Sequence, residues 1–302
     1  MAAHVAYEIA IVGAGRVGQT LGRLLHLQGH HITAVSCRTR LAAARAVAFI
    51  GAGEACIYDD LPQLAAQKKP TVVLMTTTDD ALAPMVDRLA RRQAQWHEIV
   101  ILHCSGALSS AVLSPLRQRG AHVGSMHPLH AFGVAHADRD VLSGVHWTIE
   151  GDDTAKETMR RYISDLGGHC HDIQPEQKVL YHAAASLAGN HLTGLLSLCF
   201  KLLAQCGIAP DQARAMLLPL SEGLLQRIRT EGEVAALAGP ISRGDTTVVA
   251  RHVSALRDLS PLSYQVYCGL GTELVALARQ QGTSPTALDD ITALLKPQAS
   301  AT

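Results

Sequence analysis

A glycine-rich turn near the start of the chain constrains its fold more than any other feature. Directly after the apolar run Ile9–Val12, the chain reads Gly13, Ala14, Gly15, Arg16, Val17 and Gly18. A helical pattern follows, and the order of strand, G-x-G-x-x-G turn and helix is typical of a dinucleotide-binding unit. Gly13 would take the tight turn, Gly15 would let a pyrophosphate approach the backbone, and Gly18 would let the helix lie close to the strand. We therefore expect all six residues to contact a dinucleotide, with its phosphates at the helix N-terminus.

The first half of the chain alternates apolar, strand-like runs with amphipathic helical stretches. Strands are predicted at 9–12, 32–36, 55–58, 71–75, 99–103, 122–125, 146–149 and 169–173. Helices are predicted between several of them, at 17–28, 41–49, 80–92 and 155–166. This alternation predicts an α/β fold with a Rossmann-type doubly wound, mostly parallel sheet, forming a domain over residues 1–174.

The second half of the chain is predicted to be an all-helical domain over residues 175–302. It opens with one long helix over 175–206, and further helices are expected at 211–229, 247–257, 261–281 and 285–295. The long helix is apolar around most of its circumference, so we expect neighbours to bury it on all sides. A second copy of the chain would supply part of that burial, which predicts a homodimer through the helical domain.

Composition excludes several classes of partner. The 302 residues carry 26 Lys and Arg against 26 Asp and Glu, which gives no electrostatic basis for binding nucleic acid or an anionic membrane. No uncharged apolar stretch is expected to have the length of a membrane span. The seven cysteines are odd in number and form no C-x-x-C, which predicts reduced thiols in the cytoplasm. His169 and His171 offer only a pair of metal ligands, so no metal site is expected.

The predicted strand ends indicate which dinucleotide binds. The second strand ends at Ser36 and is followed by Arg38 and Arg40, either of which could contact the cofactor, with no carboxylate anywhere in 35–45. An acidic residue here would bind the ribose hydroxyls of NAD, whereas an arginine suits the 2′-phosphate of NADP. Because ligands bind at the carboxyl ends of parallel strands, the nicotinamide half is expected beside the residues that follow the fourth and fifth predicted strands. Those residues are Thr77, Thr78, Asp79 and Ser105.

A polar stripe on the long apolar helix is the candidate catalytic surface. At about 100° per residue, Lys178, His182, Ser186 and Asn190 share one helix face. Buried polar groups need partners, and a substrate cleft would provide them. Lys178 or His182 would donate a proton as a hydride arrives, with Asn190 as a third catalytic candidate and Ser186 orienting the substrate. Two loop residues are further substrate-binding candidates: His127, after the sixth strand, and Arg243, between helices.

These motifs together resemble one known family. They are the glycine turn, the Arg38 strand end, Thr78–Asp80, His103-x-Ser105-Gly106, His127–Leu129, the 178–190 helix and Gly239–Asp245. The chain is similar over nearly its whole length to the NADP-dependent oxidoreductases that join a Rossmann-like domain to a C-terminal domain of unknown function, DUF2520. That family in turn resembles the group of 6-phosphogluconate dehydrogenase, ketopantoate reductase and pyrroline-5-carboxylate reductase.

The resemblance implies roles for residues on the long helix. In the first two relatives of that group, an active-site lysine and a nearby asparagine lie on the first long helix after the Rossmann domain. Lys178 matches that lysine in place, His182 stands one turn later, and Asn190 follows two turns further on. The resemblance therefore implies fold and cofactor more firmly than substrate.

The sequence as a whole predicts a cytoplasmic NADP-dependent reductase or dehydrogenase. A hydride would pass between the nicotinamide and a small carbonyl, hydroxy-acid or imine substrate. One alternative is an imine reductase of the pyrroline-5-carboxylate reductase type, which needs no protein proton donor because the iminium is already activated. The other is a non-catalytic NADP-sensing protein that reports redox state to a partner.

Overall fold

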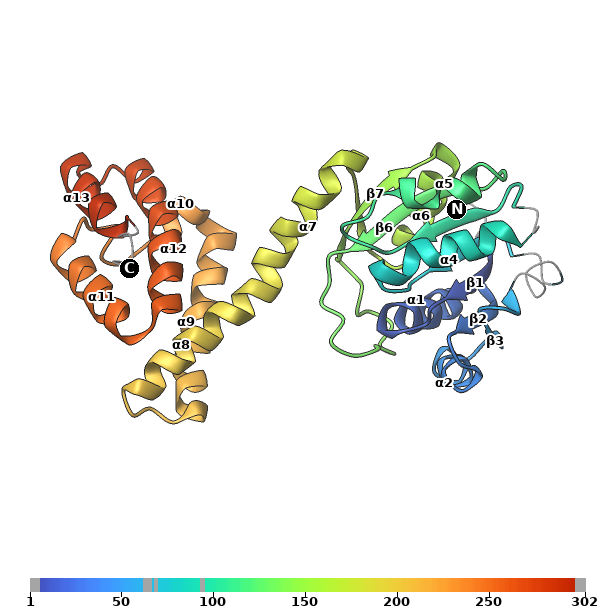
Figure 1. Ribbon diagram of the computed structural model, residues 1–302, viewed down its shortest axis with the longest axis horizontal. Coiled ribbons are helices and arrows are strands. Elements are labelled where there is room, and N and C mark those ends of the chain that lie inside the picture. Colours follow the sequence, from blue (N-terminus) through green and yellow to red (C-terminus); the bar gives the residue numbers. More distant parts are fainter. Residues whose placement is uncertain (1–5, 62–66, 68–69, 93–95, 297–302) are drawn as a thin grey trace. The chain divides into compact units, whose positions relative to one another are not determined.

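The computed structural model describes residues 6–61, 67, 70–92 and 96–296. They form two compact units, Met1–His191 and Leu192–Thr302, and each unit is described by itself (Figure 1). The division falls further along the chain than the predicted boundary after residue 174. The start of the long helix groups with the sheet because Lys178 is hydrogen-bonded to it, as shown below.

The first unit is built on an eight-stranded sheet with the order β3-β2-β1-β4-β5-β6-β7-β8. All neighbouring strands are parallel except the antiparallel pair β6 and β7, which confirms the predicted doubly wound, mostly parallel sheet. The strand order reverses between β1 and β4, where such sheets bind ligands. The strands are β1 (Glu8–Val12), β2 (His31–Cys37), β3 (Glu54–Ile57), β4 (Val72–Met75), β5 (Val100–His103), β6 (His122–Pro128), β7 (His146–Gly151) and β8 (His169–Asp172).

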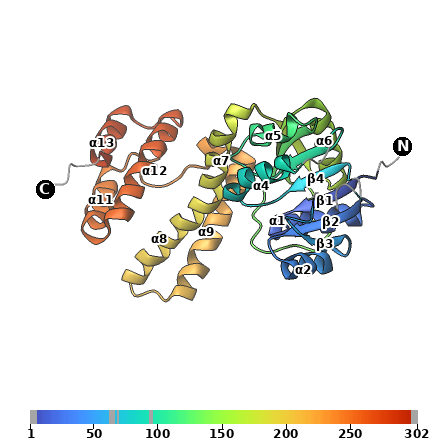
Figure 2. The same ribbon diagram turned by 45° about the vertical axis from the view of Figure 1, so that its right-hand side comes forward.

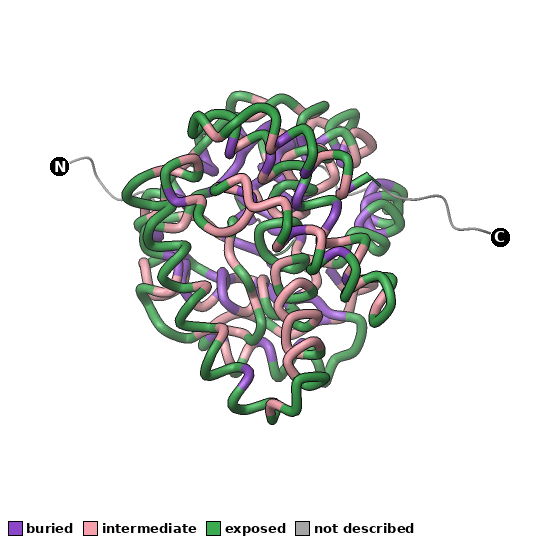
Figure 3. Tube along the Cα trace, turned by 90° about the vertical axis from the view of Figure 1, so that its left-hand side faces the viewer, coloured by how far each residue is buried: buried purple, intermediate pink, exposed green. Residues whose placement is uncertain are grey.

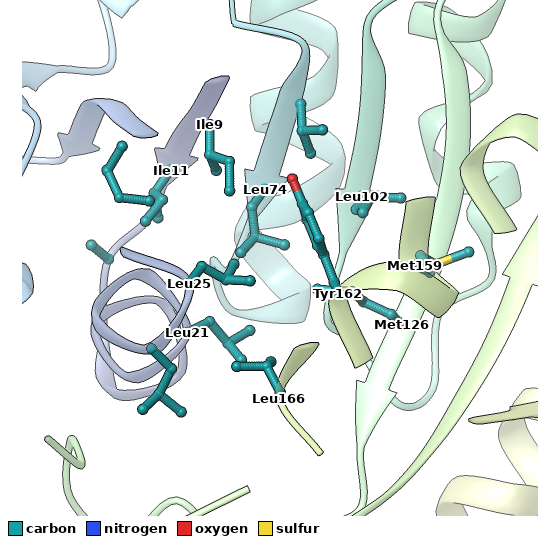
Figure 4. Close-up of a cluster of buried hydrophobic side chains, with 14 of the residues drawn as sticks. Ile9, Ile11, Leu21, Leu25, Leu74, Leu102, Met126, Met159, Tyr162 and Leu166 are labelled. Atoms are coloured by element: carbon teal, nitrogen blue, oxygen red, sulfur yellow. The ribbon is translucent and has the colours of Figure 1, made fainter. Parts of the chain in front are cut away.

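Helices cover both faces of this sheet (Figures 1 and 2). Successive side chains of a strand point to opposite faces, so β1 contributes Ile9 and Ile11 to one core and Ala10 and Val12 to the other. The first core also takes buried side chains from α1 and α6, among them Leu21, Leu25, Met159 and Tyr162 (Figure 4). The second takes them from α4 and α5. The helices of this unit are α1 (Arg16–Leu27), α2 (Arg40–Ile50), α4 (Asp79–Arg91), the 3₁₀ turn η1 (Ser110–Leu113), α5 (Ser114–Arg117) and α6 (Asp153–Asp165).

The long helix after β8 differs from the prediction of one regular α-helix over 175–206. The helical run consists of η2 (Pro175–Gln177), α7 (Lys178–Ser186), the π-helical turn η3 (Leu187–His191) and α8 (Leu192–Gln205). A π turn holds one more residue than an α turn, so the side chains after it are rotated relative to those before it. The predicted polar stripe is therefore not one continuous helix face.

The second unit is entirely helical in the part of it that the structure describes, as predicted. Its core lies among α11, α12 and α13, and includes Val249, Val253, Cys268, Ala278 and Ile291. By contrast, α8 has no buried residue and α9 has only Ala213, so the expectation that α8 is enclosed on all sides is wrong for a single chain. The helices after α8 are α9 (Pro210–Glu231), α10 (Glu233–Ala236), α11 (Thr246–Leu259), α12 (Pro261–Gln280) and α13 (Pro285–Leu295).

The helical run Pro175–Gln205 is long and apolar enough to cross a membrane by length and composition, with a mean hydropathy of 1.3. This corrects the prediction that no stretch would reach that length, because 22 residues without Asp, Glu, Lys or Arg lie between Lys178 and Lys201. None of the apolar window is buried. Figure 3 shows that buried, intermediate and exposed stretches alternate along the rest of the chain.

Candidate active site

The glycine-rich turn joins β1 to α1 and is packed against the end of β4. Gly13 has a φ of +81°, a backbone conformation that residues other than glycine rarely adopt. A Cβ at Gly13 would lie 2.4 Å from Cγ2 of Thr77, and one at Gly18 would lie 2.2 Å from Oγ1 of Thr76. Gly13 and Gly18 therefore serve the turn and the close approach of α1 to the sheet, as the spacing of the motif predicts.

Gly15 is different, because the space around it is open. A Cβ there would have only the carbonyl oxygen of Gly13 within 4 Å, at 3.9 Å. The residue is exposed and directly precedes α1, whose first N–H groups lack helical partners. Nearby, Thr77 has a buried hydroxyl with no hydrogen-bond partner among the described residues. An open backbone cradle beside an unsatisfied hydroxyl fits the pyrophosphate and sugar of a dinucleotide.

Two arginines stand just after the end of β2, and both are exposed. Ser36 is buried within the strand, and the hydroxyl of Thr39 accepts a hydrogen bond from the backbone N–H of Ala42 at the start of α2. Arg40 forms an ion pair of 3.0 Å with Asp60. Arg38 follows the last residue of β2 directly.

Several residues after β4 and β5 stabilise the backbone of the helix or turn that follows each strand. Thr78 is the N-cap residue of α4, and Asp79 lies in its first turn, where a carboxylate is favoured by the helix dipole. The hydroxyl of Ser105 accepts hydrogen bonds from the N–H groups of Ala107 at 3.2 Å and Leu108 at 2.9 Å. The Ser105 side chain thus closes the turn after β5. The backbone carbonyl oxygen of Ser105 instead contacts a candidate catalytic residue, Lys178.

Lys178 is anchored to the sheet through this carbonyl. Its Nζ donates a hydrogen bond of 2.9 Å to the Ser105 carbonyl oxygen and a second, short one to Oγ of Ser125 on β6. The residue is only 1% exposed. Lys178 therefore places a positive charge at the carboxyl end of β5, in the interior of the first unit.

Two imidazoles and a phenol lie beside this lysine. The hydroxyl of Tyr181 is hydrogen-bonded to Nδ1 of His127 at 2.8 Å, and the rings of His127 and His182 are 5.6 Å apart. Both imidazoles pack against Gly106, where a Cβ would lie 2.3 Å from Nδ1 of His182 and 2.9 Å from Nε2 of His127. The missing side chain of Gly106 lets both rings reach the turn after β5.

Burial sets the charge state of this cluster. Burial lowers the pKa of Lys178 to about 8, and the negative charges of Glu150 and Asp79 partly oppose that shift. Burial, reinforced by the Lys178 charge, lowers the pKa of His127 to about 4 and that of His103 to about 3. At neutral pH, both histidines are therefore uncharged, whereas Lys178 is still mainly protonated.

The structure gathers some of the predicted site residues and separates others. Lys178, His182 and His127 come together, although His127 lies on β6, paired with Thr148, and not in the predicted loop. Ser186 is hydrogen-bonded to His191, with Oγ 3.3 Å from Nδ1. Asn190 is exposed in the π turn. Arg243 is exposed in the second unit, before α11.

Four residues of the cluster were not predicted as site residues: Gly106, Ser125, Glu150 and Tyr181. Ser125 lies within a strand whose pattern indicates only a buried interior. Tyr181 had a signal in its spacing, because it lies three residues after Lys178 and so close to the same helix face. The spacing of Glu150 and Gly106 contained no such signal, because their roles depend on which strand ends the fold brings together.

Two family models match the chain. Residues 3–128 match the Rossmann-like domain, and residues 145–274 match the domain of unknown function DUF2520. A search of curated proteins finds no match to the chain.

Solved structures share this fold at low identity. A Bacteroides fragilis protein assigned as an NADP oxidoreductase is 21% identical, with 89% of this chain and 98% of that chain covered and a TM-score of 0.70. The reductive aminase of Aspergillus terreus, solved with NADPH, is 16% identical, with coverages of 96% and 93% and a TM-score of 0.58. The pyrroline-5-carboxylate reductase of Coxiella burnetii is 12% identical, with coverages of 97% and 100% and a TM-score of 0.58.

The sequence resemblance, the sheet topology and the two domain matches agree with one another. The glycine turn occupies the switch point of a Rossmann-like sheet, and the candidate catalytic helix falls within the DUF2520 match. The chain belongs to the family of proteins that join a Rossmann-like domain to a DUF2520 domain.

Proposed function

We propose that this protein is an NADP-dependent reductase or dehydrogenase acting on a small carbonyl or hydroxy-acid substrate. One observation carries the proposal: the buried ammonium group of Lys178 lies at the carboxyl end of β5, in the sheet whose first turn is shaped for a dinucleotide. Parallel strands place their carboxyl ends at one edge of a sheet. A hydride donor and a proton donor would therefore meet at that edge.

The residues that would hold the cofactor follow from the geometry. The backbone of Gly13–Gly18 would receive the pyrophosphate, and Arg38 would pair with the 2′-phosphate. The ends of β4 and β5, with Thr77, Asp79 and Ser105, would lie beside the nicotinamide. NADPH, when bound, supplies the hydride.

The chain would supply the proton and orient the substrate. With a pKa of about 8, the Lys178 ammonium is available at neutral pH to protonate a carbonyl oxygen as it gains negative charge. His182, whose Nδ1 is buried without a hydrogen-bond partner among the described residues, is the other candidate donor. His127, Ser186 and Asn190 are proposed as substrate contacts.

Thermal denaturation with NADPH and with NADH tests the cofactor assignment. We expect NADPH to raise the melting temperature more, because a 2′-phosphate gains charge-assisted hydrogen bonds from Arg38. Arg38→Ser should weaken NADPH binding by about 10- to 100-fold, which corresponds to about 1.5–3 kcal/mol for hydrogen bonds to a charged group. Arg40→Ser is the matched control, because Arg40 is paired with Asp60. A stronger effect of NADH on the wild-type protein would contradict the assignment.

One observation favours an imine substrate as the second candidate. Both hydrogen-bond acceptors of Lys178 are protein atoms, and the residue is 1% exposed. An imine reductase needs no proton from such a group, because its iminium substrate is already activated. Turnover that survives the loss of both Lys178 and His182 would favour the imine reductase. Cofactor binding without turnover over a broad substrate panel would instead indicate an NADP-sensing protein.

We also propose that the protein is a homodimer joined through the helical unit. Large apolar side chains are exposed on α9 at i, i+4 spacing, at Met216, Leu220, Leu224 and Ile228. Together with the unburied α8, they form an apolar surface of the kind that soluble proteins bury in interfaces. A second copy carries the same surface, so a two-fold interface is self-complementary. We place the protein in the cytoplasm, because all seven cysteines are free.

A further inference from the structure

A buried carboxylate lies close to the candidate proton donor. Glu150, at the end of β7, is 3% exposed. Its Oε1 accepts a hydrogen bond of 2.6 Å from the Ser110 N–H, and its Oε2 accepts one of 2.7 Å from the Ser110 hydroxyl. A carboxylate withdrawn from water is costly unless hydrogen bonds and a counter-charge compensate it. Ser110 supplies the hydrogen bonds, but it carries no charge, so the positive counter-charge must come from another residue.

The strand pairing places Lys178 beside this carboxylate. Glu150 on β7 is paired directly with Ser125 on β6, so the two side chains lie on the same face of the sheet. Side chains paired in this way have Cβ atoms about 5 Å apart. The hydroxyl of Ser125 accepts a hydrogen bond from Nζ of Lys178. The carboxylate and the ammonium thus share one buried face, and Ser125 is adjacent to both.

We propose that Glu150 is a positioning residue for Lys178: its buried carboxylate is the counter-charge that holds the ammonium group in place and keeps it protonated at the site. The inference rests on the proposed function, in which that ammonium acts as a proton donor. Glu150 acts through Lys178 and touches neither substrate nor cofactor.

The other groups around Lys178 cannot replace this carboxylate. Burial keeps His103 and His127 neutral by lowering each pKa, to about 3 and about 4, and keeps Cys104 neutral by raising its pKa to about 12. His182, on the same helix, carries no negative charge in either protonation state. Asp79, at the start of α4, is a carboxylate, but it is exposed, so solvent screens its charge. Glu150 is therefore the anion near Lys178 that water screens least.

The charge of Glu150 opposes the effect of burial on Lys178. Burial alone lowers the pKa of a lysine, and a nearby negative charge raises it. Because the Lys178 pKa is lowered only to about 8, removing the Glu150 charge should lower it further. The ammonium form of Lys178 dominates below its pKa. Without the Glu150 charge, Lys178 would therefore lose its proton, and cease to be a proton donor, at a lower pH.

The test is a pH titration of the Lys178 side chain by NMR, in the full-length protein labelled at lysine Cε and without cofactor. In Glu150→Gln, the Lys178 midpoint should fall by about one unit or more relative to wild type. Asp172→Asn is the matched control, because it removes a carboxylate that is exposed and paired with Arg160. It should leave the midpoint unchanged. Lys201, in the second unit, provides the internal reference signal.

A conservative variant keeps the test decisive if Glu150→Gln does not fold. Glu150→Asp retains the charge but withdraws it by one methylene, so the Lys178 midpoint should fall measurably relative to wild type, by less than the one unit expected for loss of the charge. A Lys178 midpoint that matches the Asp172→Asn control in the folded Glu150 variant would overturn the proposal. The titration needs neither cofactor nor substrate, so it tests the role of Glu150 alone. The proposed function is tested separately, by whether Lys178→Met retains turnover.

Discussion

Lys178 shows how single residues at this site take their chemistry from burial. An exposed lysine is a poor proton donor at neutral pH because its pKa lies far above 7. Enclosure beside Ser105 and Ser125 lowers the Lys178 pKa to about 8, close to the range in which a general acid is most effective. The neutral His127 and His103 around it leave that charge as the dominant one in the cluster.

Replacing this lysine should remove most of the activity. We expect Lys178→Met to lower kcat by about 10²- to 10⁴-fold, the usual contribution of a general acid. Lys201→Met is the control, since Lys201 is exposed on α8. In the wild-type protein, the protonated lysine is the donor, so kcat for carbonyl reduction should fall as the pH rises through about 8. Unchanged kcat in Lys178→Met would remove the residue from the mechanism.

Gly106 is a second residue whose effect is local. A methyl group there would come within 2.3 Å of His182 Nδ1 and 2.9 Å of His127 Nε2, so Gly106→Ala must displace both imidazoles. We expect kcat/KM to fall by about 10- to 100-fold, since displacements near 1 Å at a site have effects of this size. Gly269→Ala, where a Cβ has no atom within 4 Å, is the control and should match wild type. Unaltered kcat/KM in Gly106→Ala would show that the positions of the two imidazoles do not matter.

At the scale of elements, helix periodicity correctly predicted that Lys178, His182 and Ser186 share a face, because all three lie within α7, but it failed at Asn190. The π turn Leu187–His191 inserts an extra residue, so Asn190 is exposed and Ser186 pairs with His191. Strand boundaries were better predicted, because apolar runs bounded by turns have a clear period. The exception is β6, which extends through His127 to Pro128 because it pairs there with β7, a long-range contact without a local signal.

The contact between α1 and β4 makes a prediction of its own. A Cβ at Gly18 would lie 2.2 Å from Oγ1 of Thr76, so Gly18→Ala should lower the free energy of unfolding by about 1–3 kcal/mol, as overpacking does. In denaturant unfolding, Gly269→Ala should instead be neutral or stabilising by up to about 1 kcal/mol, because alanine favours helix. Adding Thr76→Ala to Gly18→Ala should restore part of the loss. Equal free energies of unfolding for Gly18→Ala and Gly269→Ala would contradict this packing argument.

On the scale of the whole molecule, a single chain leaves its helical unit incompletely covered. The core of that unit lies among α11, α12 and α13, whereas α8 and α9 bury almost nothing. Four exposed apolar residues follow one stripe along α9, and Leu218 and Leu225 are exposed beside it. A second copy is the proposed cover, since a marginally stable fold gains most from burying such surface.

Sedimentation equilibrium tests the proposed dimer. The wild-type protein should have twice the chain mass of 32.1 kDa at micromolar concentration. Leu220→Glu combined with Leu224→Glu should shift it to the monomer, because the charges would be buried in the interface without partners. Leu41→Glu, at a position 64% exposed in the first unit, should leave the dimer intact. A monomeric wild-type protein would contradict the proposal.

The sequence by itself determined the features that depend on neighbouring residues. The glycine turn, the alternation of strands and helices, the helical second half and the placement of Lys178 beside His182 all follow from local spacing and periodicity. Tertiary structure alone decided which distant groups surround the lysine: Ser125 and Glu150 from β6 and β7, His127 from the extended β6, and the gap left by Gly106. The physical reason is that a side chain's pKa and partners depend on burial and on strand register, and both are set by contacts between residues far apart in the chain.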